Sequence, residues 1–383
     1  MRPSSKVLEI LEQLIAFKTV SRDSNLELIH WVRGYLADYG IASRLTYDSS
    51  GLKANLFATV GEGKKPGIIL SGHTDVVPVD GQQWDSDPFR ARISDARLYA
   101  RGAADMKGYI ATALASVPAF LQSGGDSAIH LALSYDEEIG CIGVRGLIQD
   151  LQETGLQPAG CIVGEPTSMR PIIAHKGTHR FRCCVRGREA HSSYTTQGVN
   201  SIEYAARIVV YIRDLAERLA REEKRDDAYT VPYSTLQTGL IRGGIATNIV
   251  PKDCEFQFEA RTLPDMDAAA LYQEIQAYAA GLLPEMRKVD PLAAIHFEWL
   301  ASAPGLQMQE DDDIVLLASS LAGNLPNGAV SYGTEAGLFQ QAGIPTVICG
   351  PGNIEQAHTP NEYVELEQLA QCELFMQRLQ ARN

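Results

Sequence analysis

The chain alternates between two spacings of apolar residues. Segments whose apolar positions lie three or four residues apart, as in an amphipathic helix, are residues 6–17, 26–39, 109–121 and 144–151. Short apolar runs of strand type are residues 55–60, 66–70, 128–135 and 160–164. Because strands and helices alternate, we predict a doubly wound α/β domain with a mostly parallel sheet and helices on both faces.

The pattern changes between residues 177 and 302. The predicted order there is strand, helix, strand, strand, helix, strand, at residues 179–186, 199–223, 234–239, 253–262, 267–282 and 294–300. This β-α-β-β-α-β order is typical of a ferredoxin-like α+β fold. Cys254, Phe256, Phe258 and Ala260 recur with the period of two expected of a sheet with one covered face. We therefore expect residues 177–302 to form a separate, inserted domain.

Strand–helix alternation returns after this insert. Helices predicted at residues 313–322, 336–341 and 365–379 surround a strand predicted at residues 346–349. We therefore assign residues 1–176 and 303–383 to one discontinuous domain.

The composition is that of an acidic globular protein. Its 383 residues suit two or three domains, and its hydrophobic share of 45% is ordinary for packed cores. The net charge of -13 argues against a nucleic-acid or anionic-membrane partner. No apolar run reaches the ~18 residues of a transmembrane helix, and residues 1–12 lack a signal-peptide apolar region. The seven cysteines form no C-x-x-C pair, which indicates reduced thiols in a cytoplasmic protein.

His73 and Asp75 follow the predicted strand at residues 66–70 after a serine and a glycine. In an extended segment, residues two apart point to the same side, so these two side chains can touch. A metal-bound histidine usually donates its second ring N–H to a carboxylate, which sets its orientation. The pair therefore suggests a metal ligand with its orienting partner, although a histidine beside an aspartate is also common in surface turns.

Further acid and imidazole groups lie just past predicted strands or in loop turns: Asp105, Glu137, Glu138, Glu165 and His358. Ligands of doubly wound sheets bind at the carboxyl ends of the strands. A mixed shell of histidine and carboxylate suits Zn²⁺ or Co²⁺. Two histidines and three carboxylates suffice for two ions ~3.5–4 Å apart that share one water, if one aspartate bridges them. One carboxylate then remains as a general base, and the adjacent Glu137 and Glu138 can divide these two roles.

Each of these residues also has a structural interpretation. Asp105 could cap the helix that follows it. Glu137 and Glu138 could form a solvated turn, Glu165 could be a loop residue, and His358 could cap a turn. The coincidence of all of them at strand ends favours the metal site.

The motifs that contain these residues resemble those of the M20 family of di-zinc amidohydrolases. They occur in the family's order at residues 71–75, 102–108, 136–138, 164–167 and 357–358. Further segments are most similar to the members that deacetylate N-acetyl-ornithine, namely residues 174–177, 230–233, 332–336 and 356–358. The resemblance covers nearly the whole chain.

The resemblance implies two zinc ions per subunit, or cobalt in their place, and assigns the five metal ligands. His73 and Glu165 would hold one ion, Glu138 and His358 the other, and Asp105 would bridge them. No ligand of the family pattern is missing from this sequence.

The resemblance also implies the surroundings of the metals. Asp75 would orient His73, a cis peptide bond would join Asp105 to Met106, and Glu137 would be the general base. The inserted domain would form a homodimer, and its His191 would reach the active site of the partner to stabilise the oxyanion. The alternative for His191 is a strand-end histidine that serves only the dimer contact.

Three residues are candidates for substrate binding. Asn248 and Arg261 match family positions that contact the substrate carboxylate, and the planar fork of Arg261 suits that group. A cationic ornithine side chain would require an acidic partner, for which Glu335 is our candidate. The alternatives are an ion pair along the strand for Arg261 and a helix-start carboxylate for Glu335.

The expected activity is hydrolysis of N2-acetyl-L-ornithine to L-ornithine and acetate, a step of arginine biosynthesis. Alternatives with the same chemistry are deacylation of N-acetylcitrulline, N-succinyl-diaminopimelate or other N-acyl amino acids, and dipeptide hydrolysis. One methylene or hydroxyl in a pocket changes the free energy by only ~1–3 kcal/mol, so the sequence separates these substrates poorly. A catalytically silent protein that binds an amino-acid derivative is the non-enzymatic alternative.

Overall fold

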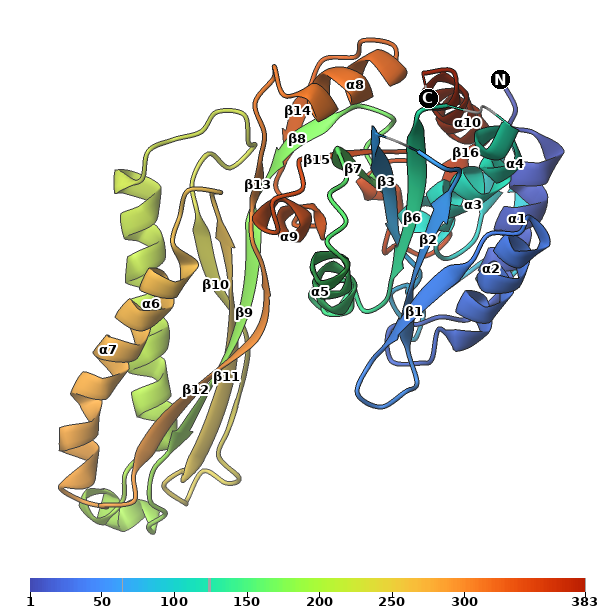
Figure 1. The fold of residues 1–383 in the computed structure, drawn as a ribbon. Coiled ribbons are helices and arrows are strands. Elements are labelled where there is room, and N and C mark those ends of the chain that lie inside the picture. The colour runs from blue at the N-terminus through green and yellow to red at the C-terminus, as the bar shows by residue number, and fades with distance from the viewer. Residues whose placement is uncertain (64, 123–124, 383) are drawn as a thin grey trace. The chain divides into compact units, whose positions relative to one another are not determined.

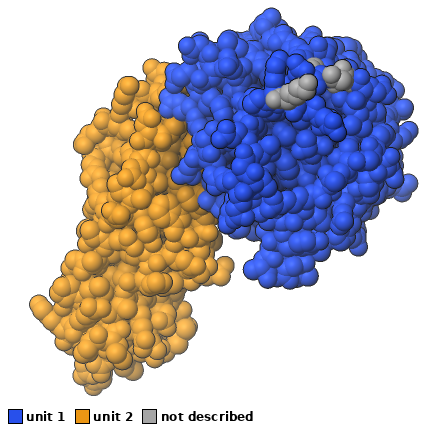
Figure 2. All heavy atoms as spheres, viewed as in Figure 1, with its two compact units in different colours: residues 1–174, 306–329, 334–383 blue, residues 175–305, 330–333 orange. Residues whose placement is uncertain are grey.

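The computed structural model describes residues 1–63, 65–122 and 125–382. The chain divides into two compact units (Figure 2). Unit 1 comprises residues 1–174, 306–329 and 334–383, and unit 2 comprises residues 175–305 and 330–333. Residues 330–333 join unit 2, where the backbone N–H of Lys176 donates to the carbonyl of Val330.

Unit 1 is built around the large sheet labelled in Figure 1. The strands of this sheet are β1 (Ser43–Tyr47), β2 (Ala54–Val60), β3 (Lys65–His73), β6 (Ser127–Ser134), β7 (Gly160–Pro166), β8 (Ile172–His175), β13 (Leu306–Gln307), β14 (Gly328–Val330) and β15 (Thr346–Gly350). The helices of unit 1 are α1 (Ser5–Ala16), α2 (Leu26–Asp38), α3 (Gly108–Ala115), α4 (Val117–Gln122), α5 (Val144–Thr154), α8 (Asp313–Leu321), α9 (Ala336–Gln341) and α10 (Leu366–Gln380).

The centre of this sheet is parallel. The strand order is β1-β2-β6-β3-β7-β15-β8-β13, with β14 beside β8. Strands β6, β3, β7 and β15 run parallel to one another, whereas the pairs β1–β2, β2–β6 and β15–β8 are antiparallel. This largely parallel centre confirms the predicted fold class and places the carboxyl ends of four strands at one edge of the sheet.

Two neighbouring residues of β3 show that helices cover both faces of the sheet. Gly72 faces α3, because a Cβ added to it would meet Ile110 and Met106 at 2.9–3.1 Å. The hydroxyl of Ser71 instead bonds Glu335, at the start of α9. Since successive side chains of a strand point to opposite faces, α3 and α9 lie on different sides of the sheet.

Two predicted helices have different bounds in the structure. The segment predicted at residues 109–121 divides into α3 and α4, because Pro118 has no N–H with which to continue the hydrogen-bond ladder. The helix predicted at residues 267–282 is α7 (Ala268–Arg287), which continues through Pro284.

A small three-stranded sheet lies in unit 1 and was not predicted. It consists of β16 (Tyr363–Glu365), β5 (Arg97–Tyr99) and β4 (Arg92–Ser94), in that order. Tyr363 pairs with Tyr99 and Glu365 with Arg97 in antiparallel register. This sheet brings the end of the chain beside the segment that leads to residues 103–107.

Unit 2 has the predicted β-α-β-β-α-β order. Its elements are β9 (Gly177–Arg186), the 3₁₀ turn η2 (Ser192–Gln197), α6 (Ser201–Glu222), β10 (Thr235–Gly243), β11 (Asp253–Thr262), α7 and β12 (Ala294–Ala303). The antiparallel sheet has the order β10-β11-β9-β12, and α6 and α7 lie along one face of it (Figure 1). Phe181, Phe256, Ile208 and Ile275 belong to the buried cluster between this face and the helices.

No helix of the described residues is long and apolar enough to cross a membrane.

Replacement of Gly164 by alanine is expected to destabilise unit 1. A Cβ at this position of β7 would lie 2.0–2.4 Å from ring atoms of the buried Tyr109. Overpacking of this kind typically costs ~1–3 kcal/mol of unfolding free energy. Denaturant unfolding of Gly164→Ala would measure the loss.

Gly34→Ala is the matched control, because its added Cβ has no described atom within 4 Å. In the middle of α2 this change should stabilise the protein by ~0.5–1 kcal/mol. Equal unfolding midpoints for Gly164→Ala and the unmodified protein would contradict the predicted clash.

Candidate metal centre

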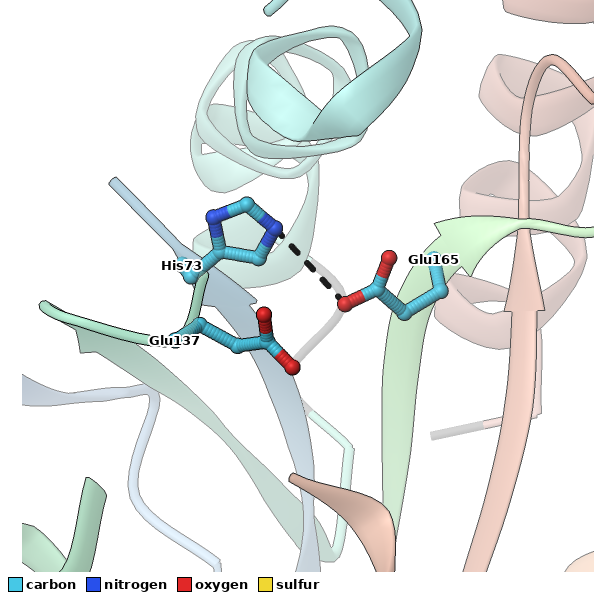
Figure 3. A group of neighbouring side chains, drawn as sticks. All are labelled: His73, Glu137 and Glu165. Carbon is cyan, nitrogen blue, oxygen red and sulfur yellow. Dashed lines mark ion pairs between the residues drawn. The ribbon is translucent and has the colours of Figure 1, made fainter. Parts of the chain in front are cut away.

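Acidic and imidazole side chains gather at the carboxyl ends of the parallel strands. His73 is the last residue of β3, Glu165 lies near the end of β7, and Glu137 and Glu138 follow β6. Figure 3 shows His73, Glu137 and Glu165 pointing toward one another. One ligand atom from each of these three lies within 4.8 Å of the others.

Asp105 presents its two carboxylate oxygens to two different histidines. Its Oδ1 lies 2.9 Å from Nε2 of His73, and its Oδ2 lies 3.1 Å from Nε2 of His358. Asp105 belongs to an irregular turn, η1 (Ala103–Lys107), and a cis peptide bond joins it to Met106. The carboxylate faces the histidines and caps no helix, so the alternative of a helix-capping Asp105 is wrong.

Each histidine has a second carboxylate partner. His73 Nε2 lies 3.6 Å from Oε1 of Glu165, and His358 Nε2 lies 3.0 Å from Oε2 of Glu138. The structure therefore brings together all five residues predicted as metal ligands. The pairs on either side of Asp105 are the same two pairs that the family resemblance implies, His73 with Glu165 and His358 with Glu138.

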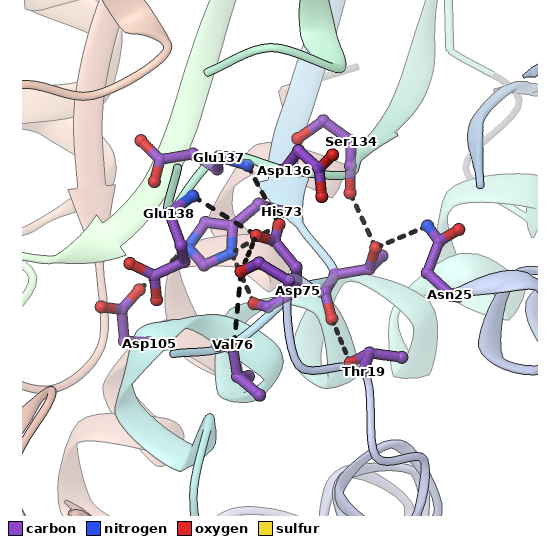
Figure 4. A network of polar contacts seen from close by, with 12 residues as sticks. Thr19, Asn25, His73, Asp75, Val76, Asp105, Ser134, Asp136, Glu137 and Glu138 are labelled. Carbon is purple, nitrogen blue, oxygen red and sulfur yellow. Dashed lines mark hydrogen bonds and ion pairs between the residues drawn. The ribbon is translucent and has the colours of Figure 1, made fainter. Parts of the chain in front are cut away.

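Asp75 connects several parts of this arrangement by hydrogen bonds (Figure 4). Its carboxylate accepts hydrogen bonds from the backbone N–H groups of Glu137 (3.1 Å) and Glu138 (3.3 Å) and from the Ser21 hydroxyl (2.7 Å). Nδ1 of His73 lies 2.9 Å from the main-chain carbonyl of Asp75 and 3.6 Å from its carboxylate. A neutral His73 that donates from Nδ1 presents Nε2 as its metal-binding atom.

Burial and mutual charge shift the pKa values of the whole cluster. Burial would lower the pKa of His73, but the hydrogen bond to Asp105 and the charge of Glu165 raise it well above its usual value. Hydrogen bonds to Asp105 and Glu138 raise the pKa of His358 to about 11. Burial, together with the charge of Asp105, raises the pKa values of Glu138 and Glu165.

Glu137 is the acid of the cluster that is not predicted to bind a metal. Burial raises its pKa to about 8, with the charge of Glu138 acting in the same direction and that of His73 against it. Its Oε1 accepts a contact of 3.2 Å from the Cys141 thiol. A carboxylate with a raised pKa beside candidate metal ligands is the pattern expected of a general base.

The donor set fits two divalent cations. Among the described residues, the carboxylates of Asp105, Glu138 and Glu165 have only histidines as recorded polar partners. Cations would offset the repulsion between these buried acids, and imidazole with carboxylate is the ligand chemistry of Zn²⁺ and Co²⁺.

Glu335 is fully buried at the start of α9. Its Oε1 accepts from the Ser71 hydroxyl (2.6 Å) and its Oε2 from the Ser134 hydroxyl (2.7 Å). These serines belong to β3 and β6, close to His73 and Glu137 along the chain. Because both carboxylate oxygens have internal donors, this geometry does not support the predicted contact of Glu335 with substrate.

The other predicted site residues belong to unit 2. His191 is exposed, and its Nδ1 accepts a hydrogen bond of 3.1 Å from the backbone N–H of Ser193. Asn248 is exposed as well. Arg261 forms an ion pair with Glu259 on the same strand and donates to the Thr178 hydroxyl at 2.8 Å. The strand ion pair considered as an alternative for Arg261 is therefore present.

Sequence reasoning missed the supporting residues Ser21 and Glu362. The hydroxyl of Ser21 bonds the carboxylate of Asp75, and the carboxylate of Glu362 bonds the backbone of Asp105. Ser21 carried no recognisable signal. Glu362 precedes the short strand β16 directly and is buried. Its position next to the apolar residues of that strand was a weak signal in the sequence that its charge could be buried.

The sequence matches one family of known proteins. The profile of peptidase family M20/M25/M40 matches residues 69–382. Acetylornithine deacetylase of Pasteurella multocida is 33% identical over 374 residues, which are 96% of this chain and 95% of that protein. Acetylornithine deacetylase of Klebsiella pneumoniae is 35% identical over 368 residues, 94% of this chain and 92% of that protein.

Solved structures share the fold at lower identity. An M20-family metallo-carboxypeptidase from Sulfolobus solfataricus is 18% identical with a TM-score of 0.78, and the match covers 99% of both chains. A dinuclear metal-binding M20 peptidase from Bacillus subtilis is 17% identical with a TM-score of 0.69, covering 98% of this chain and 97% of that one. The chain belongs to peptidase family M20/M25/M40, as its motifs predict, and is a metal-dependent hydrolase of amide bonds.

Metal binding is expected to release protons. The raised pKa values of His73 and His358 mean that both imidazoles carry a proton at pH 7 in the metal-free protein. Each must lose that proton before it can bind a metal, so zinc affinity should rise with pH. Titration calorimetry in buffers of different ionisation enthalpy should therefore detect a net release of protons as the ions bind.

The variant His358→Ala is the comparison, because it lacks one of the protonated imidazoles and should release fewer protons. A binding heat that does not depend on the buffer would contradict the prediction.

Proposed function

We propose that this chain deacetylates N2-acetyl-L-ornithine to L-ornithine and acetate. The observation that supports the chemistry best is the carboxylate of Asp105, which lies between two histidines with a further carboxylate beside each. The substrate is proposed from the relatives named acetylornithine deacetylase, which are 33–35% identical over most of the chain. Its product would feed arginine biosynthesis in the cytoplasm.

The five ligands proposed for two zinc or cobalt ions are His73, Asp105, Glu138, Glu165 and His358. Bound ions would polarise the amide carbonyl and lower the pKa of a shared water, to ~7 in well-studied zinc sites. Asp105 is the proposed bridging ligand, since each of its oxygens faces a different histidine.

Glu137 is the proposed general base. It would accept the proton of the attacking water and then donate it to the leaving amine. The backbone N–H of Glu137 donates to the carboxylate of Asp75. Because Asp75 lies two residues after His73, this bond fixes Glu137 relative to the end of β3. The pKa of about 8 that burial gives Glu137 would fall beside cations, because positive charge favours the carboxylate.

His191 is the proposed donor to the oxyanion of a partner subunit, in a homodimer formed through unit 2. The backbone N–H of Ser193 donates to Nδ1 of His191, so the neutral ring carries its proton on Nε2. This tautomer presents Nε2–H as a hydrogen-bond donor. Asn248 and Arg261 are proposed to contact the substrate carboxylate, and Arg261 would then have to exchange or share its partner Glu259.

Other N-acyl amino acids and dipeptides are the second candidate class of substrate. They would use the same metal-activated water, and the difference of one methylene or hydroxyl is worth only ~1–3 kcal/mol. A hydrolysis panel separates these candidates.

Glu137→Gln is expected to lower kcat by ~10²–10⁴-fold while both metal ions stay bound, because it removes only the proton acceptor. The assay would use N-acetyl-ornithine, N-acetyl-citrulline, N-acetyl-methionine, N-succinyl-diaminopimelate and a dipeptide, with metal content measured in parallel. Glu9→Gln, a change at an exposed residue of α1, is the matched control.

If the protein prefers another acyl amide, the proposed metal site stands and the proposed substrate is rejected. Two bound metals with no turnover of any substrate would favour the silent binding protein instead.

His191→Ala is expected to lower kcat by ~10²–10³-fold, the usual effect of removing one oxyanion donor. A subunit-mixing experiment tests whether this histidine acts across a dimer. Random mixing of His191→Ala with Glu137→Gln subunits should restore about a quarter of full activity, since half of the dimers contain one complete site. No recovery on mixing would place His191 in its own subunit's site or outside catalysis.

A further inference from the structure

Three side chains that the proposed mechanism does not use connect the turn of Asp105 to the loop of His358. They are Gln82, Arg101 and Glu362. Arg101 and Glu362 are each 1% exposed and form an ion pair with an Nη1–Oε2 distance of 2.7 Å. Gln82 is half-buried.

Glu362 holds the backbone of the bridging aspartate. Its Oε1 accepts hydrogen bonds from the N–H of Ala104 (3.0 Å) and the N–H of Asp105 (3.2 Å). Its Oε2 accepts from Arg101. A buried carboxylate with three donors is satisfied, so Glu362 has no need of a metal.

Arg101 continues the connection toward Gln82. Its Nη2 donates to Oε1 of Gln82 at 2.6 Å, and its guanidinium lies over the Trp84 ring at 5.2 Å from the centroid. The Trp84 indole N–H donates to the same oxygen of Gln82 at 3.1 Å. Since arginine and tryptophan are donors only, these two contacts determine which end of the Gln82 amide is the oxygen.

The amide nitrogen of Gln82 therefore points away from Arg101. It donates to the main-chain carbonyl of His358 at 2.9 Å. His358 is half exposed, with a side-chain accessibility of 51%, and has a positive φ of 61°. The two residues that follow it, Thr359 and Pro360, are exposed. The bond from Gln82 thus anchors an otherwise exposed segment at the residue that supplies the imidazole.

We propose that Gln82, Arg101 and Glu362 are positioning residues that set the place of His358 relative to Asp105. The proposal rests on the proposed metal-binding function. A buried ion pair contributes little net stability, because desolvation offsets the attraction between the charges. The ion pair instead links two distant backbone segments. Glu362 bonds the backbone of Asp105, and Arg101 contacts Gln82, which bonds the backbone of His358. Residues 105 and 358 are 253 positions apart in the sequence.

Loss of the hydrogen bond from Gln82 to His358 should affect one of the two proposed metal positions more than the other. His73 and Glu165 belong to strands β3 and β7 of the central sheet, and their backbone does not depend on Gln82. Loss of the Gln82 bond should therefore weaken the ion held by His358 and Glu138 more than the other ion. Loss of a residue that orients a metal ligand typically lowers metal affinity or activity by ~10–100-fold.

Gln82→Leu tests this inference by cobalt titration of the metal-free full-length protein, followed by visible absorption and calorimetry. We expect one Co²⁺ to bind with unchanged affinity and the second to bind ~10–100-fold more weakly. The lost activity should recover at high cobalt concentration. Gln83→Leu, the same change at the exposed neighbouring residue, should leave both affinities unchanged.

A second variant, Gln82→Glu, keeps an acceptor for Arg101 but removes the donor to the His358 carbonyl. It should show the same selective loss, which a disturbed fold alone would not produce. Wild-type affinity for both ions, or an equal loss at both, would overturn the inference. Metal titration gives this answer even if no acyl amino acid is hydrolysed, so failure of the proposed substrate is distinguishable from failure of the proposal.

Discussion

Repulsion among buried carboxylates is the constraint on which this site depends. Asp105, Glu138, Glu165 and Glu137 share a small volume with two imidazoles, and burial raises the pKa values of the three glutamates. Such a cluster is unfavourable without protons or cations, so by itself it does not stabilise the fold. The parallel centre of the sheet makes it possible, because adjacent strands end at one edge and hold the backbone of the ligands rigidly.

The acids around the site fall into two classes by the donors that they accept. Asp75, Glu335 and Glu362 accept hydrogen bonds from backbone N–H groups or serine hydroxyls of the protein. These partners satisfy the carboxylates internally and leave them a supporting role. The acids proposed to bind metal are paired with histidines, which can exchange a proton for a cation. Burial alone does not distinguish the two classes among the described residues, whereas the presence of backbone or hydroxyl donors does.

Much of the fold and of the site could be predicted from the sequence, for one physical reason. Alternating apolar patterns identified strands long enough to show a period, and their ends located His73, Glu137, Glu138 and Glu165. Asp105 and His358 lie in irregular segments without such a pattern, and their roles came from the family motifs. Strands β4, β5 and β16 have three residues each, too few to show a period. The sheet that they form was therefore missed, and Glu362 with it.

Glu335 shows what a pattern of residue types cannot reveal. An acid at the start of a helix beside a predicted active site is chemically suited to bind a cationic substrate. Whether it does so depends on which way the helix faces, and α9 turns Glu335 toward the hydroxyls of Ser71 and Ser134. These serines lie on adjacent parallel strands, so the carboxylate connects β3 to β6 just before His73 and the candidate residues Glu137 and Glu138. We selected Glu335 as a candidate for its charge, but in the structure its carboxylate accepts two hydrogen bonds from serines. The sequence pattern around Glu335 does not show that Ser71 and Ser134 are its partners.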